Sequence, residues 1–145
     1  MNFLTHNKMA VVEAAGAAAQ TALTSEIVDM RDFGGVVFAA LLGDVSDGCV
    51  LGLNVEHGDQ AGGGDMAATT LSATFTAGAT SADSKLLTVE CYHPLKRYVR
   101  AVLTRTTANA IVGGILSIQF EPKEVPVSQD ATNIDHEFAA SPPSA

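Results

Sequence analysis

The chain contains no Trp, and aromatic residues make up only 6% of its 145 positions. Carbohydrate-binding modules use exposed aromatic platforms, whereas the aromatics here are Tyr92, Tyr98 and six Phe, most of them inside apolar runs. The hydrophobic fraction of 47% therefore comes mainly from the small residues Ala, Val and Leu. Such a chain can bury a core, unlike a disordered one. We expect a slim domain whose thin layers need support from neighbouring molecules.

Cysteine is also scarce. Cys49 and Cys91 are the only two, and both lie in apolar runs where a free thiol behaves as a small hydrophobe. Two cysteines do not make a disulfide scaffold, so we expect free thiols and assembly in a reducing cytoplasm. The four His show no HxxxH spacing, and the sequence has no CxxC. The sequence therefore predicts no metal site and no cofactor.

Long apolar runs are missing as well. The stretches 33–43 and 110–120 are rich in Gly and far shorter than the roughly 18 residues of a membrane span. Near the N-terminus, Glu13 interrupts an apolar run that is too short for a signal peptide. We therefore expect no membrane partner.

Cations are few, with 8 Lys and Arg against 16 Asp and Glu, and the net charge is −8. An acidic surface repels phosphate backbones, so we expect no nucleic-acid partner. Half of the cations fall within one short stretch, which contains Lys96, Arg97, Arg100 and Arg105. The chain after Phe120 is acidic. This separation predicts electrostatic contact within a subunit or between copies, and the alternative is two solvated surfaces.

Catalytic motifs are absent. The glycines at 62–64 are not followed by the Lys and Ser or Thr of a phosphate-binding loop, and the sequence has no GxSxG. Asp44 and Asp47 lie in a stretch with turn chemistry, which explains them without an acid–base role. We therefore expect that the chain is not an enzyme.

From Thr24 onward the sequence has the pattern of short β-strands separated by turns. In 49–57, apolar residues occupy every second position, while Asn54 and Glu56 fall on the other face. The expected strands cover 24–30, 36–42, 49–57, 69–76, 85–91, 97–106 and 110–121. About seven short strands separated by turn signals predict an all-β fold, a β-sandwich or a jelly-roll-like barrel.

Both ends of the chain differ from this pattern. Residues 1–23 are polar and then Ala-rich, which predicts an N-terminal arm with one helical turn beside a sandwich domain over 24–121. Residues 122–145 hold several Pro among polar residues, which predicts an extended C-terminal tail, disordered in the free protein. Candidate anchors by which the tail would dock on a neighbour include Val125, Val127 and Phe138.

The most distinctive local segment is 96–103. Val99, Ala101 and Leu103 share one face of the expected strand, whereas Tyr98, Arg100 and Val102 share the other. An aromatic ring and a guanidinium beside an aliphatic group are enriched in protein interfaces. We therefore predict an interface that includes Lys96, Arg97, Tyr98 and Arg100, the alternative being a solvated strand whose Arg pairs with a neighbouring carboxylate.

Several short motifs resemble small structural proteins of tailed bacteriophages, the capsid decoration or cement proteins. They are Asp29-Met30, Phe33-Gly-Gly-Val-Val-Phe38, the turn Gly43-Asp-Val-Ser-Asp-Gly48, Lys96-Arg-Tyr-Val-Arg100 and Pro122. The resemblance covers roughly residues 24 to 127. It implies a β-sandwich on the capsid exterior that clamps the major capsid protein, assembled in the host cytoplasm.

A slim sandwich with long arms fits such an assembly, because other subunits would bury its exposed faces. Further copies of the chain, as a trimer or dimer, are the second expected partner. Two alternatives stay open, namely a head–tail connector or tail structural protein, and a host- or carbohydrate-binding module.

Overall fold

The computed structural model describes residues 2–140 and 144. Strands make up 54% of the described residues and helix makes up 3%, which confirms the all-β prediction. The elements, in chain order, are α1 (Phe3–His6), β1 (Lys8–Glu13), β2 (Gly16–Ala19), β3 (Leu23–Thr24), β4 (Val28–Asp29), β5 (Phe33–Val45), β6 (Val50–Gly58), β7 (Ala67–Thr76), β8 (Leu86–Tyr92), β9 (Tyr98–Thr106) and β10 (Ala110–Pro122). The strands predicted from residue 36 onward coincide with β5 to β10 to within a few residues.

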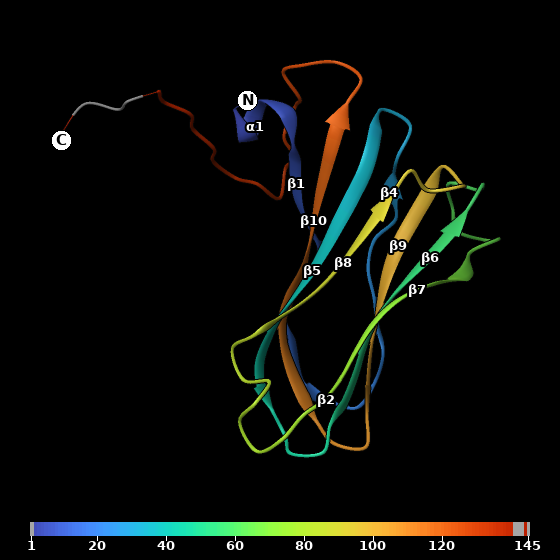
Figure 1. The fold of residues 1–145 in the computed structure, drawn as a ribbon, viewed down its shortest axis with the longest axis vertical. Coiled ribbons are helices and arrows are strands. Elements are labelled where there is room, and N and C mark those ends of the chain that lie inside the picture. Colours follow the sequence, from blue (N-terminus) through green and yellow to red (C-terminus); the bar gives the residue numbers. More distant parts are fainter. Residues whose placement is uncertain (1, 141–143, 145) are drawn as a thin grey trace.

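Two antiparallel sheets lie face to face as a sandwich (Figure 1). The first sheet has the order β1-β10-β5-β8, and β2 also pairs with β10. The second sheet has the order β3-β9-β6-β7, and β4 also pairs with β9. Because β10 lies between β1 and β5, the start and the end of the strand region are neighbours, with Lys8 opposite Gln119.

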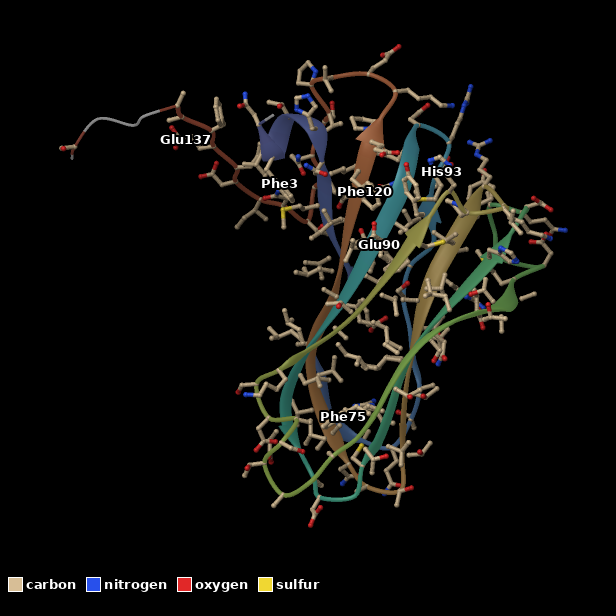
Figure 2. All side chains as sticks on the ribbon, viewed as in Figure 1. Phe3, Phe75, Glu90, His93, Phe120 and Glu137 are labelled. Atoms are coloured by element: carbon tan, nitrogen blue, oxygen red, sulfur yellow. The ribbon has the colours of Figure 1, made fainter. Side chains whose placement is uncertain are left out.

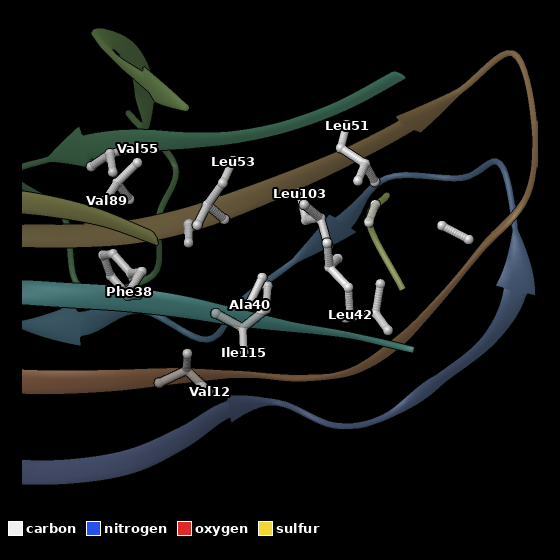
Figure 3. Packing of buried hydrophobic residues seen from close by; sticks show 14 of the residues in the cluster. Val12, Phe38, Ala40, Leu42, Leu51, Leu53, Val55, Val89, Leu103 and Ile115 are labelled. Atoms are coloured by element: carbon white, nitrogen blue, oxygen red, sulfur yellow. The ribbon is translucent and has the colours of Figure 1, made fainter. Parts of the chain in front are cut away.

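The core fills the space between the two sheets (Figure 3). Alternate residues of β5, such as Phe38 and Ala40, meet alternate residues of β6 and β9, such as Leu53 and Leu103. All four are fully buried, as the period-two pattern predicts. The side chains are small, so the two sheets form the slim sandwich that the composition indicates.

Arg105 continues the inward-facing row of β9 and is only 2% exposed. Its guanidinium donates hydrogen bonds to the carbonyl oxygens of Ala17, Thr21 and Ala110 and to the Thr21 hydroxyl. The sequence grouped Arg105 with a surface cluster of cations, and the structure corrects this. Strand alternation turns residue 105 inward, where acceptors from the N-terminal segment and from Ala110 of β10 satisfy its donors.

The N-terminal segment is also more ordered than the predicted arm. The expected helical turn is present as α1, but residues 8–13 and 16–19 form β1 and β2 against β10. Val12 is buried in the core. Ala favours helix, but pairing with the long β10 overrides that preference. The sandwich therefore includes residues 8–13 and 16–19 of the predicted arm.

Residues 123–140 form no strand, as the prediction of an extended tail requires, but part of this tail rests on the chain itself. The Val127 N–H donates to the Thr5 carbonyl oxygen. The Gln129 amide donates to the carbonyls of Leu4 and Asn7 and accepts from the Met9 N–H. The Thr132 hydroxyl accepts the Val11 N–H. These contacts hold residues 127–132 beside α1 and β1, which differs from the predicted disorder.

Candidate interaction surface

Arg97 and Asp29 form a bidentate ion pair at one end of the second sheet. Arg97 Nε lies 2.9 Å from Asp29 Oδ1, and Arg97 Nη2 lies 2.8 Å from Asp29 Oδ2. β4 positions Asp29 directly opposite Tyr98, the first residue of β9. The hydrogen bond from Arg97 lowers the pKa of the Asp29 carboxyl and raises that of Arg97. The Arg97 guanidinium also lies 5.0 Å from the centre of the Tyr98 ring.

The other two surface cations of this segment are paired as well. Arg100 and Glu56 face each other across β9 and β6, with Nε and Oε2 2.6 Å apart. Lys96 Nζ lies 3.3 Å from Asp59 Oδ2, in the loop after β6. The structure therefore brings Lys96, Arg97, Tyr98 and Arg100 together, and each cation of the group has a carboxylate partner in the same subunit. These partners do not come from the acidic tail.

The predicted tail anchors lie elsewhere. Val125 and Phe138 are about half exposed, and Val127 lies beside α1. Figure 1 shows the tail and α1 next to β1, away from β9, β6 and β7. The structure therefore does not join the anchors and the cationic segment into one surface. Whether either group contacts a partner stays a prediction.

A different surface is apolar on nearly every strand, namely the outer face of the first sheet. The inward residues of β5 are Val36, Phe38, Ala40 and Leu42, so Val37, Ala39 and Leu41 point outward. Their paired neighbours across the sheet continue this face. It comprises Met9 and Val11 of β1, Leu116, Ile118 and Phe120 of β10, Val37, Ala39 and Leu41 of β5, and Leu86, Thr88, Glu90 and Tyr92 of β8. We call this set the apolar face.

Exposure is greatest on β5 and β8. Leu41 is 47% exposed and Leu86, directly opposite it, is 61% exposed. Glu90 is the only charged residue of the apolar face. The outer face of the second sheet is polar by contrast, with Asn54 and Glu56 on β6 and Arg100 and Thr104 on β9. Antiparallel sheets usually turn one polar face to water, and the first sheet does not.

An aromatic cluster closes one end of the apolar face. Phe120 and Tyr92 stack with ring centres 5.9 Å apart and planes 9° apart. The Tyr92 hydroxyl donates to Glu121, and this bond raises the pKa of Tyr92. His93 lies 3.6 Å from the same carboxylate. Figure 2 shows Phe120, Glu90 and His93 at this end of the molecule, far from Phe75.

Sequence reasoning missed the apolar face, although a signal was present. The runs 36–42 and 110–120 are nearly continuous apolar sequence and do not alternate. Such runs are typical of strands that are covered on both sides. The sequence supported a central strand, but it did not reveal which layer would cover the second side. No element of the described residues covers the exposed side chains of β5 and β8 there.

The described residues offer few groups for metal binding or thiol chemistry. In residues 2–140 and 144, no group of three or more His, Cys, Asp or Glu is placed to hold a metal ion. Cys49 is buried and Cys91 half-buried, both are unpaired, and burial raises the pKa of each thiol. The helix that the structure describes is too short to cross a membrane. What the surface offers is apolar area for contact.

No protein-family model matches the chain, and no curated protein matches it either. Among solved structures, the PBSX exported protein XepA aligns with 16% identity and a TM-score of 0.52. The alignment covers 100% of this chain but only 44% of XepA. At this level of identity the likeness concerns the fold alone.

Two further solved structures align less closely. Murine APRIL gives a TM-score of 0.45 with 12% identity over 79% of this chain and 99% of APRIL. The Eiger TNF of S. frugiperda gives a TM-score of 0.42 with 9% identity over 86% of this chain and 99% of that protein. The fold class itself, a two-sheet β-sandwich, is shown by the two antiparallel sheets of the structure, as the sequence predicts.

Proposed function

We propose that this chain is a structural protein of a bacteriophage particle, a decoration protein whose apolar face packs against the major capsid protein. The observation that carries the proposal is the apolar face itself. A soluble monomer rarely exposes a contiguous apolar surface of more than a few hundred Å², and larger ones mark interaction sites. An outer layer supplied by another protein would give the first sheet the cover that its sequence favours.

Two further points support the particle assignment. The motifs between residues 24 and 127 resemble capsid decoration proteins, and the aligned solved structure XepA is a phage-derived protein. A decoration protein also needs no catalytic group, and its many copies each contribute modest affinity. Contact by apolar area suits a chain of net charge −8, because repulsion between acidic surfaces is weak on a face where Glu90 is the only charged residue.

The test is binding of purified protein to phage particles prepared without it. The double variant Leu41→Ser/Ile118→Ser removes apolar area from two separate rows of the apolar face. We expect it to remain folded, because both side chains point out of the core, and to bind at least roughly tenfold more weakly. Circular dichroism checks the fold, and titration onto particles measures the affinity.

The matched control is Val50→Ser/Val102→Ser on the outer face of the second sheet, where one residue is exposed and the other half-buried. This variant should bind as the native chain does. Equal affinity of the Leu41/Ile118 variant and the native chain would exclude the apolar face as the capsid contact.

A further inference from the structure

The two sheets have several edges, and the chain protects them unequally. At the β1 edge, side chains of the tail accept the Met9 and Val11 N–H groups. At the far edge of the second sheet, β3 and β4 are only 2 residues long each. Natural proteins commonly use such covers and short strands to prevent edge-to-edge pairing. These two edges therefore offer little to another strand.

β7 has no such protection. It forms the other edge of the second sheet, and β6 is its only strand partner in the described chain. Its 10 residues, Ala67–Thr76, contain neither a charged residue nor Pro. All 10 of these residues are exposed or only half-buried. A long uncharged edge is a template for pairing with another strand.

The register shows which backbone groups of β7 are free. The pairing with β6 is regular from Ser72 to Thr76. Just beyond it, the Ala77 N–H donates to the Cys49 carbonyl and so points toward β6. Because successive residues of an antiparallel ladder alternate in direction, Thr76, Thr74 and Ser72 direct their N–H and C=O groups away from β6. Three successive outward pairs of donor and acceptor are thus available at this edge.

The stretch Ser72-Ala-Thr-Phe-Thr76 is nearly symmetric about Thr74. If two copies pair antiparallel about a twofold axis at Thr74, Ser72 lies opposite Thr76, and Ala73 lies opposite Phe75. Hydroxyl residues then face hydroxyl residues, and the small Ala faces the large Phe, pairings that stabilise sheets. A chain of net charge −8 also meets a second copy here without placing like charges together.

The apolar side chains beside the β7 edge also favour a second copy of the chain as the partner. Phe75 is 43% exposed and Leu86 of β8 is 61% exposed, and both line a pocket of ≈ 210 Å³ where β7 and β8 lie close together. Figure 2 places Phe75 at the end of the sandwich opposite Phe120. A strand added to β7 would cover apolar surface at this pocket as well as satisfy backbone groups.

We propose that β7 pairs with β7 of a second copy, so that the second sheet continues across the twofold axis of a dimer. Such an isologous contact is self-complementary and closed. The proposal goes beyond the proposed capsid binding and does not depend on it, because the backbone of β7 in the second sheet makes the contact, and Leu86 is the one member of the apolar face that lines the pocket beside it. Failure of one contact therefore leaves the other intact.

The first experiment measures the mass of the full chain by sedimentation velocity across a range of concentrations. The native chain should approach twice its mass of 14.9 kDa. Thr74 is exposed and would lie opposite itself, so Thr74→Lys and Thr74→Glu each place like charges face to face. Each variant alone should dimerise roughly fivefold more weakly. Mixing the two should restore association, because Lys and Glu then face each other.

The matched control is Thr106→Lys, which adds the same charge to an exposed Thr on β9, away from the edge. It should dimerise as the native chain does. A second variant, Thr74→Pro, removes the outward N–H without touching the ladder to β6, and losing one hydrogen bond in each copy should raise the dimer Kd roughly thirtyfold. Thr74→Val keeps that N–H and should dimerise normally.

A native chain that stays at 14.9 kDa at every concentration overturns the proposal. So does a Thr74→Lys variant that dimerises as well as the native chain, or a Lys and Glu mixture that associates no better than either variant alone. If circular dichroism shows that Thr74→Pro does not fold, the Thr74→Lys and Thr74→Glu variants still test the dimer contact. The Leu41→Ser/Ile118→Ser variant should keep the dimer and lose only particle binding, which separates this contact from the proposed function.

Discussion

The ring of Phe120 lies directly over Gly35. These residues are paired across β10 and β5, and a Cβ at Gly35 would come within 2.3 Å of the Phe120 ring. The absence of a side chain at residue 35 lets the ring lie flat on the sheet and stack with Tyr92, whose strand pairs with the other side of β5. Gly35 is therefore required here for space, and not for an unusual backbone conformation.

Gly35→Ala should force Phe120 out of this position and disturb the aromatic end of the apolar face. We expect a loss of about 1–3 kcal/mol in the free energy of unfolding, the usual cost of overpacking. Urea denaturation measures it. Gly62→Ala is the control, because no atom lies within 4 Å of a Cβ there, and it should leave stability nearly unchanged. Equal stability of both variants would show that Phe120 moves aside at no cost.

Arg105→Met should destabilise the chain by about 1–3 kcal/mol, because the buried carbonyl of Ala110 loses its donor and the more exposed carbonyls of Ala17 and Thr21 lose theirs. β2 should also detach, since Arg105 ties the segment around it to β9. Hydrogen exchange of the amides in 16–19 reports that detachment. Arg97→Met, which removes an exposed ion pair, should have a far smaller effect. Slow exchange in 16–19 of the Arg105 variant would contradict this role.

Arg100 belongs to the interface that the sequence predicts on residues 96–103. In the structure it pairs with Glu56, so Arg100→Ala should lower the stability of the isolated chain by about 0.5–1 kcal/mol. Because this pair lies on the second sheet, particle binding should stay unchanged at low and high salt. A salt-sensitive loss of about 1–3 kcal/mol in binding would instead make β9 part of the interface. Particle titrations with a folding check decide between these results.

Deleting residues 128–145 should leave the sandwich folded but uncover the β1 edge. Met9 and Val11 would lose the side-chain acceptors Gln129 and Thr132, and their amide hydrogens should then exchange faster. NMR-detected exchange measures both amides. The double variant Gln129→Ala/Thr132→Ala tests the same two bonds with the tail present. Unchanged exchange of both amides in the deletion variant and in the double variant would mean that these contacts do not persist in solution.

Asp29 should make the chain less stable in acid. Its pKa lies below the ordinary value of 3.8, chiefly because Arg97 donates hydrogen bonds to it. A lowered folded-state pKa contributes stability above the unfolded value, and that contribution is lost as the pH falls through the folded value. Asp29→Asn should therefore flatten the decline in stability below about pH 4. Urea unfolding at pH 7 and pH 3 tests this, with the exposed Asp47→Asn as control.

The sequence predicted the strands that alternate or are strongly apolar, which became β5 to β10. It did not predict β1 and β2, because their Ala-rich residues carry no clear period and gain their structure from β10. The inward position of Arg105 was readable from its spacing to Leu103, but charge proximity suggested a surface cluster instead. The partners of Lys96, Arg97 and Arg100 come from distant strands, so only the assembled sheet reveals them.

The placement of β10 between β1 and β5 has a consequence for biosynthesis. The first sheet cannot assemble until the ribosome has released residues up to Pro122. β1 and β5 do not pair with each other directly, so both need β10 between them. Contacts between residues this far apart in sequence slow folding. Until β10 arrives, the apolar residues of β1 and β5 remain uncovered in the nascent chain, where such surfaces promote aggregation. Chaperones that hold unfinished chains should therefore raise the yield of this protein.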